Sequence, residues 1–329
     1  MKKILGAASA LLMTSALLTG CATSNNSSGG SGGGSNTAKV KVVTSTDVYA
    51  DLVKQVGGDN VDVHAFVSST ATDPHSYEAS ASDKLQIKDA KLAVVNGGGY
   101  DYFLEKDAGQ NNQKVVNAVK TSGKLSDADY DHLIEHHSGG EGHGHNHGSE
   151  AEEGGGHEHA HEFNEHLWYD FDTVKKVTNK IADDLAEIDS SHADQYRENA
   201  KKLTGEMDSL EESAKKISGK YIATEPVPDY LISSTGAENS TPAEFAEAVE
   251  EGKDVPAITL QETKDLVTEK KVNLVAYNSQ TETSQTKEVL QSAKDSGVAN
   301  VSFTETLPEN TKYVDWMKSN VSNLEKALS

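Results

Sequence analysis

The sequence has little of several features that common functional classes need. A single cysteine, Cys21, excludes an internal disulfide. The 30 basic residues are outnumbered by 52 acidic ones, and a net charge of −22 excludes the basic surface that nucleic-acid binding requires. The hydrolase patterns H-E-x-x-H and G-x-S-x-G each occur only inside a low-complexity stretch, whose composition does not predict the helix or turn that these motifs need. We therefore expect no enzymatic activity and no nucleic-acid partner.

Long hydrophobic runs are also missing, except for one close to the start of the chain. It covers residues 4–18 and follows two lysines. A basic start, a short apolar core and small residues predict a secretory signal peptide over residues 1–20. The run is too short for a membrane-spanning helix.

The residues around Cys21 predict a lipid anchor and a tether. Leu18-Thr19-Gly20-Cys21 resembles the bacterial lipobox, which implies cleavage before Cys21 and lipid on its sulfur. The alternative is an ordinary secreted protein with a free thiol. Residues 21–37 are mostly Ser, Gly and Asn, a composition typical of flexible linkers. We expect an extracytoplasmic protein that is anchored to the cell membrane through this tether.

The rest of the chain alternates between strand-like and helix-like segments. Buried strands are predicted at residues 40–43, 61–67, 92–95, 114–119, 221–224, 271–277 and 298–303. This alternation predicts an α/β fold with two lobes, each containing a mainly parallel sheet flanked by helices. We expect the lobes to cover residues 38–170 and 190–329, with ligand residues at the carboxyl ends of the strands.

Two histidines lie between carboxylates and aromatic residues, where strand-like runs give way to helical ones. They are His75, in Asp73-Pro74-His75-Ser76-Tyr77-Glu78, and His166, in Glu165-His166-Leu167-Trp168-Tyr169-Asp170. Imidazole suits zinc and its first-row neighbours, and a nearby carboxylate can hold the second ring nitrogen. Each could equally be an ordinary loop histidine. His64 lies at an alternating position in residues 61–67 and is predicted to pack in its strand.

Residues 131–162 consist largely of His, Gly and Glu. Such a polar, glycine-rich segment cannot bury enough apolar surface to fold, so we expect it to be disordered. It predicts an accessory metal-collecting loop, and the alternative is an inert solvated loop. Nine of the 13 histidines of the chain lie here: His132, His136, His137, His143, His145, His147, His157, His159 and His161.

The motifs taken together resemble a known family. The two histidine motifs, the His-rich tract between them, and Asn96-Gly97-Gly98-Gly99-Tyr100, Ala223-Thr224-Glu225-Pro226-Val227, Tyr277-Asn278-Ser279-Gln280 and Thr304-Glu305-Thr306-Leu307-Pro308 follow one another in the family's order. They closely resemble the solute-binding lipoproteins of bacterial zinc and manganese ABC importers, over about residues 40–316. The resemblance implies a rigid helix that joins the lobes, which we place at residues 171–189.

The resemblance also implies a ligand set. Its pattern adds Glu225 and Glu305 to His75 and His166 as metal ligands, and suggests Asn278, Gln280 and Glu78 as supporting hydrogen-bond partners or alternative ligands. Pro228 departs from the family pattern, because a proline there removes an N–H group and can shift the following helix. A shifted helix would also move Glu225 away from the ligand position that the family pattern implies.

The implied function is capture of Zn²⁺ between the lobes and its delivery to an ABC permease by a monomeric protein. Two carboxylates make the site harder and suit manganese, whereas the His-rich tract and the Irving–Williams order favour zinc. We predict Zn²⁺ as the cargo, with Mn²⁺ as the alternative. A surface adhesin or metal-storage lipoprotein is the second functional hypothesis.

Overall fold

The first half of the chain forms a four-stranded parallel sheet. The computed structural model describes residues 38–72, 74, 77–138, 163–215, 217–250 and 252–328. The strands are ordered β2-β1-β3-β4, with β1 Val40–Thr46, β2 Val61–Val67, β3 Leu92–Val95 and β4 Lys114–Asn117. Every pairing in this sheet is parallel, and Val42, for example, lies opposite Val63 and Leu92.

The second half repeats the arrangement. Its strands are ordered β6-β5-β7-β8 and are all parallel, with β5 Lys220–Ala223, β6 Glu238–Asn239, β7 Leu274–Asn278 and β8 Ala299–Phe303. In each half the first strand lies between the second and the third. The predicted α/β class with two parallel sheets is confirmed.

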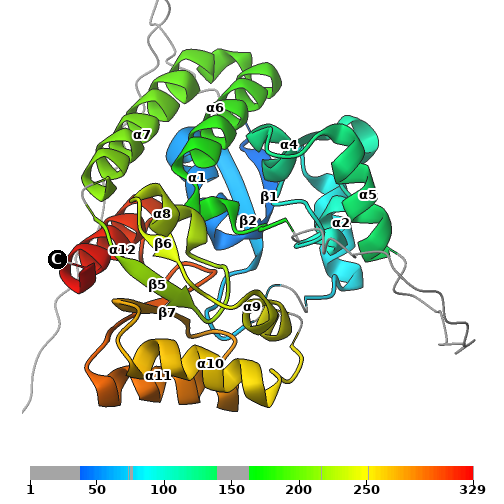
Figure 1. Cartoon of the computed structure of the whole chain (residues 1–329). Helices are drawn as coiled ribbons and strands as arrows, with labels where there is room; N and C mark the ends of the chain where they lie inside the picture. The colour runs from blue at the N-terminus through cyan, green and yellow to red at the C-terminus, as the bar shows by residue number, and fades with distance from the viewer. Residues whose placement is uncertain are drawn as a thin grey trace, which may run out of the picture. The chain divides into compact units, whose positions relative to one another are not determined.

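Helices connect the strands and cover both sheets (Figure 1). In the first half they are α1 Asp47–Gly57, α2 Ala81–Asp89, α3 Tyr102–Glu105, α4 Ala118–Ser122, α5 Asp127–Ser138 and α6 Phe171–Ile188. The next helix, α7 Ala193–Ala214, leads from the first half to the second. In the second half they are α8 Asp229–Ser234, α9 Ala243–Glu250, α10 Ala257–Thr268, α11 Ser284–Ser296 and α12 Tyr313–Leu328. Short 3₁₀ turns lie at Gly58–Asn60 (η1), Gln110–Asn112 (η2), Leu167–Tyr169 (η3) and Ser190–His192 (η4). Among the described residues, none of the helices has both the length and the apolar character needed to cross a membrane.

The alternation of side chains along the strands divides the apolar residues between different cores. Val42 points into a large core that also contains residues of α1, α6, α7 and α12, whereas Val43 packs against α2 and α3 on the other face of the same sheet. In β7, Leu274 belongs to the large core and Val275 to a separate core against α9, α10 and α11. The large core therefore contains one face of each sheet.

The helix that joins the two halves is α7, not the predicted segment 171–189. The stripe Val174, Val177, Ile181 and Leu185 does form one helix, α6, but this helix packs against α1, α4 and β4 of the first half. In contrast, α7 contacts α6 and α1 and also reaches α8 and α12 (Figure 1). Both helices are amphipathic, so the pattern of apolar residues alone did not distinguish the one that continues to the second sheet.

Two other local predictions need correction. Residues 131–138, predicted to be disordered, belong to α5, where Tyr130 is 3 % exposed and anchors the helix to the first half. Residues 139–162 lie outside the described part of the chain. His64, predicted to be packed, is exposed because β2 is an edge strand, and its ring contacts that of Phe66 with a centroid distance of 5.0 Å.

Candidate metal site

Three of the four predicted ligands are brought together from distant parts of the sequence. His166 immediately precedes η3, Glu225 follows β5, and Glu305 follows β8. Because parallel strands end at the same edge of a sheet, the segments after β5 and β8 converge there. All three side chains are buried, with exposed fractions of 2 % for His166, 7 % for Glu225 and 1 % for Glu305. His75 lies outside the described residues.

His166 is held on two sides. Its Nδ1 lies 2.8 Å from Oδ1 of Asn164, and its backbone N–H donates to the same oxygen at 3.0 Å. The ring packs edge-on against Trp168 and Tyr100, with centroid distances of 5.2 and 6.2 Å. These contacts direct Nε2 toward Glu305, whose Oε2 lies 3.9 Å away.

Glu305 accepts hydrogen bonds from both halves of the protein. The hydroxyl of Tyr100 donates to Oε2 at 3.2 Å, and Nδ2 of Asn278 donates to Oε1 at 3.0 Å. Burial, with the neighbouring Glu305 carboxylate as the next cause, raises the pKa of Tyr100 well above its usual value. Tyr100 therefore stays protonated and remains a hydrogen-bond donor to Glu305.

Asn278 connects the two carboxylates. Its Nδ2 donates to Glu305 and also, through a short hydrogen bond, to Oε2 of Glu225, which accepts a second short bond from the Thr281 hydroxyl. The Asn278 oxygen accepts the backbone N–H of Gln280 at 3.0 Å. The amide NH₂ of Asn278 thus holds one oxygen from each of two buried acids that would otherwise repel each other.

Gln280 supports the backbone of the segment that carries Glu305. Its Oε1 accepts the N–H groups of Glu305 and Thr306, the second at 3.1 Å, while Nε2 donates to the carbonyl of Thr72 at 3.4 Å. Both ends of this side chain are therefore engaged by backbone groups. The role of Gln280 as a supporting partner or an alternative ligand stays a prediction.

Among the remaining predicted residues, the structure describes the side chains of Glu78 and His132. Glu78 is exposed. His132 is exposed on α5, the side chains of His136 and His137 are not described, and the other predicted loop histidines and Cys21 lie outside the described residues. Pro228 is the N-cap of α8, so this helix begins at Asp229 and leaves Glu225 in the preceding loop.

One pair of the predicted ligands has a separation that is compatible with a shared divalent metal ion. Two atoms that bind one zinc ion at about 2.0–2.2 Å each lie at most about 4.3 Å apart. The separation of 3.9 Å between Nε2 of His166 and Oε2 of Glu305 satisfies this limit. Among the described residues, no three His, Cys, Asp or Glu side chains lie close enough together to hold a metal ion, so His166, Glu225 and Glu305 do not form a complete ligand set by themselves. His75 lies outside the described residues.

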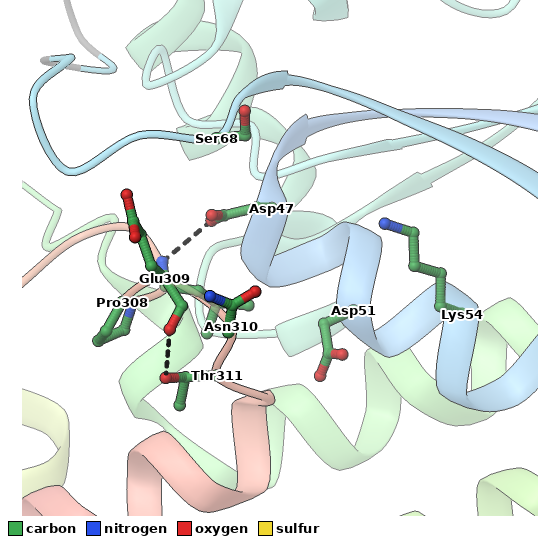
Figure 2. Close-up of a pocket in the computed structure, with 9 residues that line it drawn as sticks. Asp47, Asp51, Lys54, Ser68, Pro308, Glu309, Asn310 and Thr311 are labelled. Carbon is green, nitrogen blue, oxygen red and sulfur yellow. Dashed lines mark hydrogen bonds between the residues drawn. The ribbon is translucent and has the colours of Figure 1, made fainter. Parts of the chain in front are cut away.

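A cavity of about 430 Å³ lies between α1 and residues 307–311, and none of the three described ligand candidates, His166, Glu225 and Glu305, lines it (Figure 2). Asp47, Asp51 and Glu309 are its acidic members. Asp47 accepts the backbone N–H of Leu307 at 3.0 Å, and Asp51 accepts that of Tyr313 at 2.8 Å. This cavity marks where α1 holds the segment that follows Glu305, and we place the candidate metal site at the buried carboxylates instead.

Sequence reasoning did not identify Asn164, Tyr100 or Thr281 as partners of the predicted ligands. Asn164 could have been noticed, since an asparagine often bonds the backbone two residues further on. Tyr100 and Glu305 are 205 positions apart, so only the fold reveals their contact.

Comparisons with known proteins agree with this picture. The manganese ABC transporter substrate-binding lipoprotein PsaA of Streptococcus pneumoniae is 26 % identical over 242 residues, which cover 72 % of this chain and 67 % of PsaA. The manganese-binding lipoprotein MntA of Bacillus subtilis is 24 % identical over 342 residues, covering 98 % of this chain and 99 % of MntA. The predicted extracytoplasmic, lipid-anchored location agrees with both names.

A solved structure shares the fold. The periplasmic zinc-binding protein TroA of Treponema pallidum has a TM-score of 0.66 at 17 % identity, covering 89 % of this chain and 100 % of TroA. The family model described as "Zinc-uptake complex component A periplasmic" (ZnuA) matches residues 42–327. The chain therefore belongs to the ZnuA family, the non-enzymatic, metal-binding solute-binding proteins of ABC importers.

Proposed function

We propose that this protein captures Zn²⁺ at a site formed by His75, His166, Glu225 and Glu305 and delivers it to an ABC permease in the membrane. The observation that carries the proposal is the convergence of His166 with two buried carboxylates that share the Asn278 amide. An imidazole nitrogen and carboxylate oxygens form a mixed donor set that both Zn²⁺ and Mn²⁺ accept. His75, which is not described, is assigned from its sequence motif.

Zinc is the proposed cargo for two reasons. The Irving–Williams order places Zn²⁺ above Mn²⁺ for a given set of nitrogen and oxygen ligands. The nine histidines of residues 131–162 also give the chain a composition suited to collecting zinc. The manganese-binding relatives make Mn²⁺ the alternative, and the two carboxylates are compatible with it.

Lipid on Cys21 and the tether over residues 21–37 would keep the protein at the membrane, near its permease. This location matches the lipoprotein names of the relatives. We also propose that the protein acts as a monomer and that the His-rich tract supplies weaker, accessory zinc sites. The adhesin and metal-storage hypotheses stay predictions.

The test measures metal content and calorimetric affinity of the full chain for Zn²⁺ and Mn²⁺ in parallel. We expect one tight zinc per chain above the weaker binding of the His-rich tract, and His166→Ala should lower the affinity of that site more than about 100-fold. The control is His64→Ala, which removes an exposed histidine of β2 and should leave the tight site intact. Tight manganese that zinc displaces poorly would identify a manganese receptor. If His166→Ala kept the tight site intact, the proposed ligand set would be contradicted.

A further inference from the structure

Asn164 contacts both the ligand His166 and the second half of the protein. Its Oδ1 lies 2.8 Å from Nδ1 of His166 and accepts the backbone N–H of the same residue at 3.0 Å. Its Nδ2 donates to the carbonyl oxygen of Pro226 at 2.9 Å, and its own carbonyl accepts the hydroxyl of Tyr230 at 2.8 Å. Pro226 directly follows Glu225. Asn164 thus lies between two of the proposed ligands.

These contacts determine which end of the Asn164 amide faces His166. The carbonyl of Pro226 can only accept a hydrogen bond, so it must face the NH₂ group. The backbone N–H of His166 can only donate, so it must face the oxygen. Two independent partners therefore fix the amide in one orientation, with Oδ1 toward the imidazole.

The orientation of Asn164 in turn fixes the proton on His166. An amide oxygen only accepts, so in the neutral ring Nδ1 must carry the hydrogen. The lone pair then belongs to Nε2, the nitrogen on the side of Glu305. A metal ion that is bound by an imidazole needs this unprotonated nitrogen.

The geometry points to Asn164 as a positioning residue that holds His166 in the Nδ1–H tautomer and keeps it aligned with the segment that carries Glu225. This inference rests on the proposed role of His166 as a metal ligand. Because one side chain bonds both His166 and Pro226, the imidazole and the Glu225 segment are held as one unit before any metal arrives.

The first experiment reads the tautomer directly. Long-range ¹H–¹⁵N NMR of the metal-free full chain, at about pH 8 where imidazoles are neutral, distinguishes a protonated from an unprotonated ring nitrogen. The His166 signal is assigned by its absence in His166→Gln. We expect Nδ1–H in the wild-type chain. This readout requires no metal binding, so it is independent of the outcome for the proposed function.

The second experiment compares two substitutions of Asn164. Asn164→Ala removes the acceptor, so we expect the tautomer preference to be lost and zinc affinity of the tight site to fall about 10–100-fold. Asn164→Asp keeps an acceptor for Nδ1–H, loses the donor to Pro226 and adds a negative charge, so it should keep the tautomer and most of the affinity. Asn199→Ala is the matched control, because Asn199 bonds the carbonyl of Val56 between α7 and α1 at 2.9 Å and should affect neither readout.

The outcomes separate the two proposals. An Nε2–H ring in the wild-type chain, or an Asn164→Ala chain with unchanged tautomer or affinity, overturns the positioning role. If Asn164→Ala does not fold, the wild-type spectrum and the Asn164→Asp chain still decide it. A correct tautomer together with an intact tight site in His166→Ala would instead contradict the proposed function alone.

Discussion

Asn96 and Asn278 occupy corresponding places in the two sheets. Asn96 directly follows β3 and Asn278 ends β7, and each of these is the third strand of its half. Asn96 accepts the Tyr49 hydroxyl and donates to the backbone carbonyl of Glu165 at 2.9 Å. Asn278 donates to the side chains of Glu225 and Glu305. Asn96 therefore holds the backbone of Glu165, whereas Asn278 holds the charged side chains of Glu225 and Glu305.

The first strands of the two sheets show a similar difference. Asp47 follows β1 and bonds the backbone of Leu307, whereas Glu225 follows β5 and belongs to the candidate site. The repeated fold thus places polar residues at matching strand ends, but the second half supplies the two buried carboxylates of the candidate site, Glu225 and Glu305, and the first half supplies the histidine candidates and the supporting Tyr100. A shared topology gives a shared place for side chains and does not determine their chemistry.

The substitution with the largest expected effect tests whether a carboxylate of the second half binds the metal ion. Glu305→Gln keeps an oxygen for only one of the two donors, Tyr100 and Asn278, and removes a negative charge, so we expect the affinity for Zn²⁺ to fall more than about 100-fold by calorimetry. Glu309→Gln removes an exposed charge from the same segment and should change affinity little. Equal losses of zinc affinity in the two variants would show that only the total negative charge of this segment affects binding.

The next test sharpens the contrast between the asparagines. Asn278→Ala leaves two buried carboxylates without a shared donor, so we expect about 1–3 kcal/mol less stability and about 10–100-fold weaker zinc binding. Asn96→Ala should lower stability by a similar amount but weaken zinc binding less than about tenfold, since it touches the site only through the Glu165 backbone. Thermal unfolding and calorimetry on both variants measure the two effects. If zinc binding fell equally in both, the distinction would fail.

The smallest effect concerns Asp47. Burial raises its pKa to about 6, despite the Leu307 N–H bond that lowers it. Because the folded pKa exceeds the usual value of 3.8, protonation stabilises the folded protein at low pH, and this contribution is lost as the pH rises through about 6. Asp47→Asn keeps an acceptor without the buried charge, so it should be about 1 kcal/mol more stable at neutral pH and equal to the wild type in acid.

Denaturant unfolding of the wild type and Asp47→Asn across this pH range measures the difference. Asp59→Asn removes an exposed carboxylate of η1 and serves as the control, with no expected change. A constant difference between Asp47→Asn and the wild type at every pH would disprove titration of Asp47 as its cause.

Local patterns predicted most of the fold and part of the site. Residues 61–67 and 92–95 are the strands predicted, because β-branched apolar runs between turn residues leave few alternatives. The two-residue strand β6 was missed, since an element this short depends on packing rather than on its own sequence. In the site, the positions of Glu225 and Glu305 after strands could be read from the sequence, but their bonds to Asn278 depend on strand order.

The large core that contains one face of each sheet has a consequence for how the protein unfolds. Residues of α1, α6, α7 and α12 fill it together with strands of both halves. Neither half can lose its structure without exposing the apolar surface that the other half covers, which would cost about 25 cal/mol for each Å². We therefore expect the two sheets to unfold together in one cooperative transition despite the repeated topology.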